Sequence, residues 1–400
     1  MEAVIVAIIT SILAPLVLAW RIDRKEQTRA KFDEISKRID EVSMGNLRLQ
    51  ILNLIQHNPE NKSAILSLYD EYKTRGGNSY INCLVIDHAT FPRDKICGGG
   101  LTPKCWRLLD RLMPGFRYEY NAVNHLCILI DGEPACEFDA EDELRIVRRK
   151  DFDHQLLQQY LQAGGAFRQD SPRRIEEQSN GRITVTLTSG EVVDCRYLVG
   201  ADGTNSFVRR YLNGGRRDLG ILALEEYLEK GVYDQTNHVV IGLSRKYDKR
   251  GYFYKFPNTE VDVVGYGDMS TDIDRFRTVC KDYGVPERKI RGAYISQSTD
   301  YPRHDHIILI GDAGGFANRV TCEGIYDAIK TAYHAKEAIV GQRPFWEINR
   351  EVFAKMKRQD RLANRFFSPV GFAILRLLCR FPSTVKWCYD TKMKRETFFN

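Results

Sequence analysis

The chain has 400 residues, 43% of them hydrophobic and 28% charged, which is typical of a globular protein rather than a disordered or fibrous one. The net charge of +6 is small, and no basic run is interleaved with aromatic residues, so we exclude nucleic acid as a main partner. The ten cysteines include no C-x-x-C pair. This argues against a metal site or a disulfide framework and favours a reducing compartment.

The first segment, AVIVAIITSILAPLVLAW at residues 3–20, is apolar and uncharged, and the cationic stretch RIDRKEQTR follows it. As a helix it would be about 27 Å long, close to the roughly 30 Å of a bilayer's hydrocarbon core. We therefore expect a transmembrane anchor over residues 1–21. Because the cations follow the apolar run, the main domain is expected in the cytoplasm, as in a single-pass membrane protein. A buried core helix is the alternative.

Residues 22–80 predict a helical stalk followed by a helical hairpin. Apolar residues recur at helical spacing at positions 32, 35, 39 and 42. Asn58-Pro59 is typical of a helix start, and Gly76-Gly77 ends that helix. Through NPENKSAILSLYDEYKTRGGNSYI, residues 1–80 resemble small membrane-anchored phage proteins, including holin-like ones. That resemblance implies little chemistry.

From Cys83 the pattern changes to strands that alternate with helices. Strand-like runs occur at 83–86, 126–130, 183–188 and 306–310, and helical stretches at 151–162 and 322–340. This order predicts an α/β fold with an added antiparallel sheet. Residues 346–400 form a helical tail, for which a core-packing helix and a membrane-surface helix both stay open.

Three acidic residues stand where expected strands end. Asp87 ends the strand at 83–86, as does the acid that holds an adenosine ribose in dinucleotide-binding folds. Asp202 follows a strand within G-A-D-G, and Asp312 follows another strand before a glycine-rich turn. The helix expected beyond that turn directs free N–H groups at its start, which suits a developing negative charge.

The stretches FPRDKICGGGLTPK, ADGTNSFVRR and LIGDAGGFANRVTCEGIYDAIK occur in this order and together resemble the geranylgeranyl reductase family of flavoproteins. That family lies within the wider group of para-hydroxybenzoate hydroxylase-like FAD enzymes, and the resemblance runs from about Cys83 to the C-terminus. It implies an FAD-binding Rossmann-like domain with an antiparallel substrate sheet, at about 120–145 and 215–300, within residues 81–345. It also implies an FAD-dependent oxidoreductase that saturates isoprenoid double bonds, with NAD(P)H or another donor supplying the hydride. Hydroxylase or lycopene-cyclase-like chemistry stays open.

The resemblance also implies where cofactor and substrate bind. FAD would contact Asp87, Arg93, Asp202, Gly203, Gly311, Asp312, Gly324 and Ile325, with Asp312 on the ribityl chain and the Gly324 helix start at the flavin N1–C2 carbonyl. The reacting edge of the flavin would lie near Cys97, Gly98 and Gly99. The isoprenoid would lie along Tyr252, Tyr254, Phe256 and Pro257. An inert buried thiol is the alternative for Cys97, and core packing is the alternative for the two tyrosines.

The sequence departs from the family pattern at several positions. Tyr254 stands where tryptophan is usual, Arg319 where proline is usual, and Cys322 where glycine is usual. No G-x-G-x-x-G turn precedes Asp87, so the Rossmann-like domain is expected to be incomplete, without its first strand and its pyrophosphate turn. The alternative function is therefore a non-enzymatic, membrane-anchored fusion that carries a flavoprotein remnant unable to bind FAD.

Overall fold

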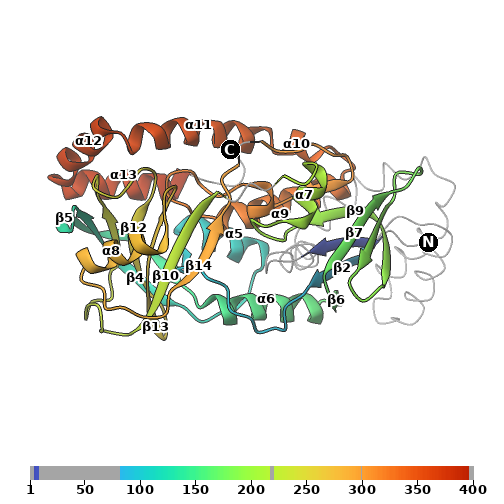
Figure 1. The fold of residues 1–400 in the computed structure, drawn as a ribbon, viewed down its shortest axis with the longest axis horizontal. Helices are drawn as coiled ribbons and strands as arrows, with labels where there is room; N and C mark the ends of the chain where they lie inside the picture. The colour runs from blue at the N-terminus through green and yellow to red at the C-terminus, as the bar shows by residue number, and fades with distance from the viewer. Residues whose placement is uncertain (1–3, 9–81, 217–219, 299, 396–400) are drawn as a thin grey trace, which may run out of the picture.

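The computed structural model describes residues 4–8, 82–216, 220–298 and 300–395, which form two β-sheets joined by helices (Figure 1). The first sheet has seven strands in the order β6-β2-β1-β9-β8-β7, and β15 also pairs with β9. These strands are β1 (Val4–Ile8), β2 (Asn82–Asp87), β6 (Ala166–Gln169), β7 (Pro172–Glu177), β8 (Ile183–Leu187), β9 (Val192–Gly200) and β15 (Ile307–Leu309).

Strand β1 occupies the central position that the sequence predicted to be vacant. Val4–Ile8 pairs in parallel with β2 on one side and with β9 on the other. The expected transmembrane helix is therefore wrong for these residues, and the rest of it lies outside the described residues, as do the expected stalk and hairpin. The run VIVAI is apolar and rich in β-branched residues. Such a short run suits a buried parallel strand as well as a helix, and periodicity alone does not separate the two.

The second sheet has eight strands in the order β14-β10-β13-β12-β11-β4-β5-β3. It is antiparallel as expected, except that β4 and β11 pair in parallel. Asp131 and Gly132, with φ of 55° and 91°, form the tight turn between β4 and β5. The strands are β3 (Gly100–Leu101), β4 (Asn121–Ile130), β5 (Glu133–Ile146), β10 (Ile221–Glu229), β11 (Val239–Leu243), β12 (Tyr252–Pro257), β13 (Val261–Asp268) and β14 (Arg291–Ile295).

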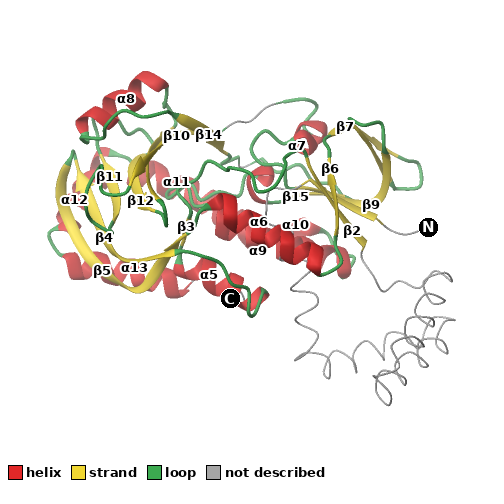
Figure 2. Ribbon diagram, turned by 90° about the horizontal axis from the view of Figure 1, so that it is seen from below, coloured by secondary structure: helices red, strands yellow, loops and turns green. Residues whose placement is uncertain are grey.

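Helices connect the two sheets and cover them. α5 (Pro103–Leu112), α6 (Arg149–Gln162) and α9 (Ile325–Val340) contribute to one apolar core together with the first sheet (Figure 2). α7 (Phe207–Leu212) covers the other face of the first sheet, and α8 (Ile273–Asp282) packs on the second. The expected helices at 151–162 and 322–340 are confirmed as α6 and α9.

The C-terminal helices lie along one side of the molecule; the first three run towards the second sheet, and the last turns back from it (Figure 1). They are α10 (Phe345–Ile348), α11 (Arg350–Phe366), α12 (Pro369–Cys379) and α13 (Pro382–Arg395), and α13 packs on β5. Within the described ranges no single helix has the length and apolar character needed to cross a bilayer. α11 and α12 meet that test only as a pair, bent by 81° at the break between them.

Candidate active site

The Cys97–Gly100 loop packs against the ring of Phe256 on β12. A Cβ on Gly98 would lie 2.5 Å from Phe256 Cδ2, so any other residue at this position would force the ring to move. Gly99 has a φ of +74°, and its added Cβ would lie 2.0 Å from the carbonyl oxygen of Val147. The consecutive glycines therefore allow the loop to approach the second sheet closely.

Three of the four residues predicted to bind substrate share one face of β12. Tyr252, Tyr254 and Phe256 alternate along the strand, and their ring centroids lie 6.0 and 5.5 Å apart in sequence order. Tyr254 is paired across the sheet with Gly265, whose absent side chain leaves room for the tyrosine ring. Pro257 belongs to the alternate set and does not join this aromatic face.

Glu225 on β10 contributes a buried carboxyl group to the same region. Its side chain is 2% exposed, and its Oε1 accepts a hydrogen bond of 2.7 Å from the Tyr254 hydroxyl. No described residue donates a hydrogen bond to Oε2. Burial raises the pKa of Glu225 to about 7, while the Tyr254 hydroxyl and the Cys97 N–H counteract this effect. The carboxyl group can therefore give up and regain a proton near neutral pH.

Tyr252 joins the aromatic face to the loop that precedes α9. Its hydroxyl donates a hydrogen bond to the carbonyl oxygen of Thr321. Burial raises the pKa of both Tyr252 and Tyr254 well above the usual value of a phenol. Both hydroxyls thus stay protonated and act as hydrogen-bond donors.

Asp312 lies in the short turn η1 (Gly311–Gly314) and faces the start of α9. A Cβ on Gly324 would lie 3.4 Å from Asp312 Oδ1. Burial raises the pKa of this carboxyl group, and the positive charges of Lys95 and Arg149 counteract this effect. Within the described residues its carboxylate accepts no hydrogen bond, so it is available to a ligand hydroxyl.

The structure brings Gly311, Gly324 and Ile325 to this same turn. Gly311 has a φ of +52°, and its added Cβ would lie 3.1 Å from Cβ of Ala328 in α9. Ile325 is the first residue of α9 and is buried. η1 and the start of α9 are therefore held close together.

Asp87 and Arg93 belong to a row of alternating charges. Asp87 is 3% exposed at the end of β2, and its Oδ2 lies 3.6 Å from Arg93 Nε. Arg93 Nη1 lies 3.6 Å from Asp153 Oδ2, and Arg149 donates to both oxygens of Asp153 at 2.8 and 3.0 Å. The row joins the end of β2 to the start of α6.

Asp202 is engaged inside the protein. Its Oδ2 accepts a hydrogen bond of 2.6 Å from the Phe207 N–H, and its Oδ1 accepts one of 2.5 Å from the Ser206 hydroxyl. The carboxylate thus holds the start of α7, while Gly203 turns the chain with a φ of +74°. A contact of Asp202 or Gly203 with the cofactor stays a prediction.

Arg319, which replaces the usual proline, stabilises the loop after η1. It is 1% exposed, and its Nη1 donates hydrogen bonds of 2.7 Å to the carbonyl oxygens of Gly315 and Ala317. Its Nη2 donates to the carbonyl oxygen of Ser298. The guanidinium group thereby satisfies three backbone acceptors that burial removes from water.

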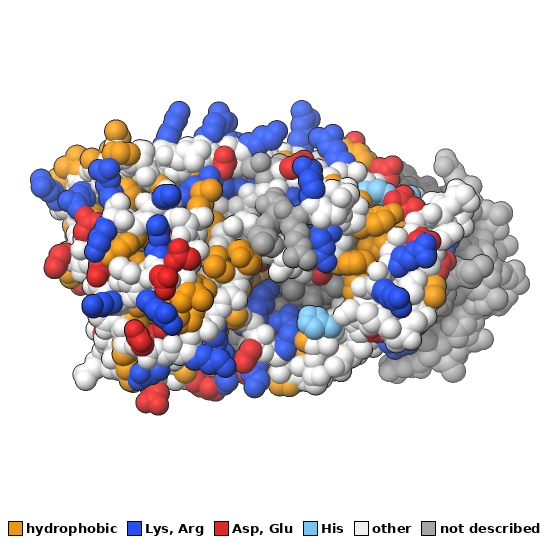
Figure 3. Space-filling model, in the orientation of Figure 1, with side chains coloured by type: hydrophobic (Ala, Val, Ile, Leu, Met, Phe, Trp, Pro, Cys, Tyr) orange, Lys and Arg blue, Asp and Glu red, His pale blue; other side chains and the backbone are white. Residues whose placement is uncertain are grey.

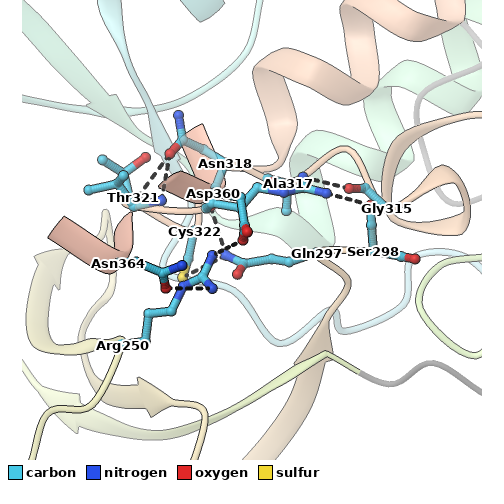
Figure 4. Close-up of polar contacts among 12 residues, drawn as sticks. Arg250, Gln297, Ser298, Gly315, Ala317, Asn318, Thr321, Cys322, Asp360 and Asn364 are labelled. Atoms are coloured by element: carbon cyan, nitrogen blue, oxygen red, sulfur yellow. Dashed lines mark hydrogen bonds and ion pairs between the residues drawn. The ribbon is translucent and has the colours of Figure 1, made fainter. Parts of the chain in front are cut away.

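Cys322, which replaces the usual glycine, adopts a backbone conformation that favours glycine. Its φ is +53°, and its Sγ lies 3.5 Å from Gln297 Nε2, which also donates to the Asn318 carbonyl oxygen (Figure 4). Burial raises the pKa of Cys322 to about 12, so the thiol stays protonated. The backbone is therefore strained at this residue.

A buried ion pair joins the start of α5 to the residues just before α9. Lys104 Nζ lies 2.6 Å from Glu323 Oε2, and both side chains are almost fully buried. The Thr102 hydroxyl also donates to Glu323. These contacts hold the residue just before Gly324 in place.

A cavity of about 240 Å³ opens beside Cys97. Its rim is charged, and Arg291 Nη1 lies 3.7 Å from Asp94 Oδ2 there. Tyr227, two residues beyond Glu225 on β10, also lines it, so Glu225 faces the same side of the sheet. Tyr252, Tyr254 and Phe256 do not line this cavity.

Sequence reasoning missed several residues of the site. One is Glu225, which with its neighbour Glu226, on the opposite face of β10, forms a pair of acids within the apolar strand ILALEEYLE, and each is 2% exposed. Two consecutive acids in an apolar strand could have indicated a functional residue, because carboxyl groups are rarely buried unless they are paired. Lys95, Arg149 and Lys104 carried no local signal.

Relatives with known names support an assignment to a family. No known protein-family profile matches the chain. An uncharacterised protein of Methanosarcina barkeri is 31% identical over 280 residues, which cover 65% of this chain and 69% of that protein. The menaquinone reductase of Mycobacterium tuberculosis is 28% identical, over 64% of this chain and 70% of that protein. The geranylgeranyl diphosphate reductase of Synechocystis is 27% identical, over 53% of this chain and 57% of that protein.

Solved structures share the fold at lower identity. A geranylgeranyl bacteriochlorophyll reductase-like protein from Thermoplasma acidophilum has a TM-score of 0.60 at 15% identity, covering 98% of this chain and 91% of that one. The halogenase PltM in complex with FAD has a TM-score of 0.61 at 14% identity, covering 99% of this chain and 86% of that one. The named relatives and the order of the three motifs together show that the chain belongs to the geranylgeranyl reductase family of FAD-dependent oxidoreductases.

Proposed function

We propose that this protein reduces carbon–carbon double bonds in an isoprenoid chain, with FAD as its cofactor and NAD(P)H or another donor as the source of electrons. The relatives named reductases support a reductase, and the name geranylgeranyl diphosphate reductase supports an isoprenoid substrate. These names do not favour the non-enzymatic alternative.

The described residues fit the flavin half of FAD. Asp312 has a half-buried carboxylate that accepts no hydrogen bond within the described ranges, which suits a ribityl hydroxyl. The start of α9 at Gly324 faces Asp312 and offers free N–H groups to the flavin carbonyl. Gly98 and Gly99 leave no side chain between the loop and the second sheet. The residues that follow β1 lie outside the described ranges, and their sequence contains no G-x-G-x-x-G turn to hold the pyrophosphate.

Reduction of an alkene needs a hydride at one carbon and a proton at the other. Bound FAD in its reduced form supplies the hydride from its N5. The protein must therefore supply an acid in a site from which water is largely excluded.

The buried Glu225 carboxyl group, hydrogen-bonded to Tyr254 beside the Cys97 loop, carries this proposal. With a pKa of about 7, it is protonated in a large fraction of molecules at neutral pH. Its Oε2 is without a donor among the described residues, so a proton on that atom can be directed at a bound alkene. Tyr254 holds Oε1 and orients the group.

The aromatic face of β12 provides the apolar surface that an isoprenoid chain needs. Tyr252, Tyr254 and Phe256 present neighbouring rings, and nearly all the binding energy of such a chain comes from apolar contact. The charged rim of the cavity beside Cys97 suits a polar end of the substrate.

The experiment first measures the visible absorbance of the purified protein and the FAD released on denaturation. Flavin-reduced protein is then mixed anaerobically with geranylgeranyl diphosphate, and the products are analysed by mass spectrometry. We expect bound FAD and a product that has gained two hydrogens per reduced bond. A protein that stays colourless with excess FAD, or a product that has gained oxygen, contradicts the proposal.

A matched pair of variants tests the acid. Glu225→Gln should slow alkene reduction by about 100-fold or more, the usual contribution of a general acid. Reduction of the flavin by its donor should be unaffected. Glu226→Gln is the control, because Glu226 is equally buried but lies on the opposite face of β10. Equal rates for the two variants would show that the proton comes from elsewhere.

A further inference from the structure

α12 is apolar on two faces, and the described residues cover only one of them. Cys379 and Leu375 pack against the cluster formed by β4 and β5, and Phe372 is also buried. On the other side, five large apolar side chains are exposed: Val370 by 67%, Ile374 by 53%, Leu377 by 55%, Leu378 by 37% and Phe381 by 56%. Their spacing, at i, i+4, i+7, i+8 and i+11, is that of one helix face.

An exposed apolar row of this kind needs a partner. Scattered exposed apolar residues are normal, but contiguous ones mark interaction surfaces. A helix that is apolar all round is buried in a core or in lipid. α12 is not enclosed by the described part of the protein, so its outer face is where the partner would bind.

The charge around α12 indicates the chemistry of that partner. Residues 361–400 contain eight basic and two acidic residues, an excess equal to the +6 of the whole chain. Arg380 ends α12 in an exposed position, and Arg376, which is 59% exposed, pairs with Asp131 at the edge of this surface. Figure 3 shows hydrophobic side chains with lysine and arginine around them at the end of the molecule where α12 lies.

We propose that the outer face of α12, from Val370 to Phe381, lies on an anionic lipid surface. The apolar side chains enter the boundary between headgroups and acyl chains, and the neighbouring arginines contact anionic headgroups. With 11 residues, α12 is about 16 Å long, which suits a helix lying in the plane of the surface rather than across it. The inference does not depend on the proposed reaction.

A second copy of the chain fits this surface less well. In a two-fold dimer the same patch faces itself, which would bring the excess of positive charge on one protomer against that on the other. Anionic headgroups neutralise the same charge. The apolar row and the basic excess together therefore favour lipid.

Hydroxyl-radical footprinting of the full chain tests the proposal, because it reports the exposure of individual side chains. Oxidation of Leu377 and Phe381 is compared without vesicles, with phosphatidylcholine vesicles, and with vesicles that also contain phosphatidylglycerol. We expect several-fold less oxidation at both residues with the anionic vesicles only. Met269 and Ile273, which are 63% and 51% exposed elsewhere, should not change.

A matched pair of double variants completes the test. Ile374→Ser with Leu377→Ser should abolish the vesicle-dependent protection of Phe381, and Met269→Ser with Ile273→Ser should leave it intact. This local measurement is independent of any binding by residues 1–21. Unchanged oxidation of Phe381 with anionic vesicles overturns the proposal. Protection that rises with protein concentration in the absence of vesicles also overturns it, because the face is then an interface between copies.

Discussion

The ring of Phe256 occupies the space that a side chain at position 98 would need. An added Cβ on Gly98 would lie 2.5 Å from Cδ2 and 3.1 Å from Cε2 of that ring. The glycine of the loop and the aromatic residue of β12 therefore constrain each other, and this contact sets how closely the loop approaches the predicted substrate face.

Gly98→Ala should lower the free energy of unfolding by about 1–3 kcal/mol, the usual cost of overpacking. Phe256→Leu frees space, so the double variant should be more stable than the sum of the single effects predicts. Chemical denaturation of the four proteins in this cycle measures the coupling. Gly324→Ala is the control, because its methyl group would approach no atom closer than 3.4 Å. Additive effects would contradict the contact.

Glu225 should make stability depend on pH. Burial raises its folded pKa from 4.5 to about 7, so the folded protein binds the proton more tightly than the unfolded chain. The associated stability is fully present below pH 4.5 and is lost as the pH rises through about 7. The difference of roughly 2.5 pH units corresponds to about 3 kcal/mol.

Glu225→Gln should remove this part of the pH dependence. Urea unfolding of both proteins between pH 4.5 and 8 measures it. Asp248, whose pKa burial raises to about 8, acts in the same direction, but its contribution cancels in the comparison of variant with wild type. If the free energy of unfolding changed with pH in the same way in both proteins, the pKa of Glu225 would not be raised in the folded state.

Cys322→Gly should stabilise the protein by about 0.5–1 kcal/mol, because a φ of +53° is strained for any residue with a Cβ. Gln342 has a φ of +49° in an exposed turn, so Gln342→Gly provides a matched control. Thermal unfolding measures both. If only Gln342→Gly is stabilising, the contact of the Cys322 thiol with Gln297 outweighs the strain.

Arg319→Met should destabilise the protein by about 3 kcal/mol or more. The substitution leaves the carbonyl oxygens of Ser298, Gly315 and Ala317 buried without this donor. Arg350 is an exposed arginine, and Arg350→Met should change stability by less than about 0.5 kcal/mol. Equal unfolding midpoints for the two variants would contradict a structural role of Arg319.

Much of the fold was predictable because its signals are local. The apolar run before Asp87 indicated β2, and the glycine-rich turn after Asp312 indicated the start of α9. The family resemblance grouped Tyr252, Tyr254 and Phe256 as substrate residues, and their alternation along β12 places the three on one face.

The remainder depends on contacts between distant parts of the chain. Thr102 donates to Glu323, 221 residues away, and nothing near either residue indicates this. Residues 4–8 form a strand that pairs with β2 on one side and with β9 on the other, both far away in the sequence. An apolar run predicts that its residues are buried, but it does not indicate whether they pack against strands or against lipid. The same residues were therefore misassigned to a membrane helix.

The order of the strands constrains how the two sheets can move. Within the described residues the chain passes from β2 to β3–β5 in the second sheet, back to β6–β9, again to β10–β14, and finally to β15. Neither sheet is therefore built from one continuous stretch, and a single proteolytic cut would not release either as a folded fragment. A hinge between the sheets would have to bend at every one of these crossings at once. The interleaved path thus favours a rigid frame, in which the Gly-rich loop, Glu225 and Asp312 keep their spacing through each catalytic cycle.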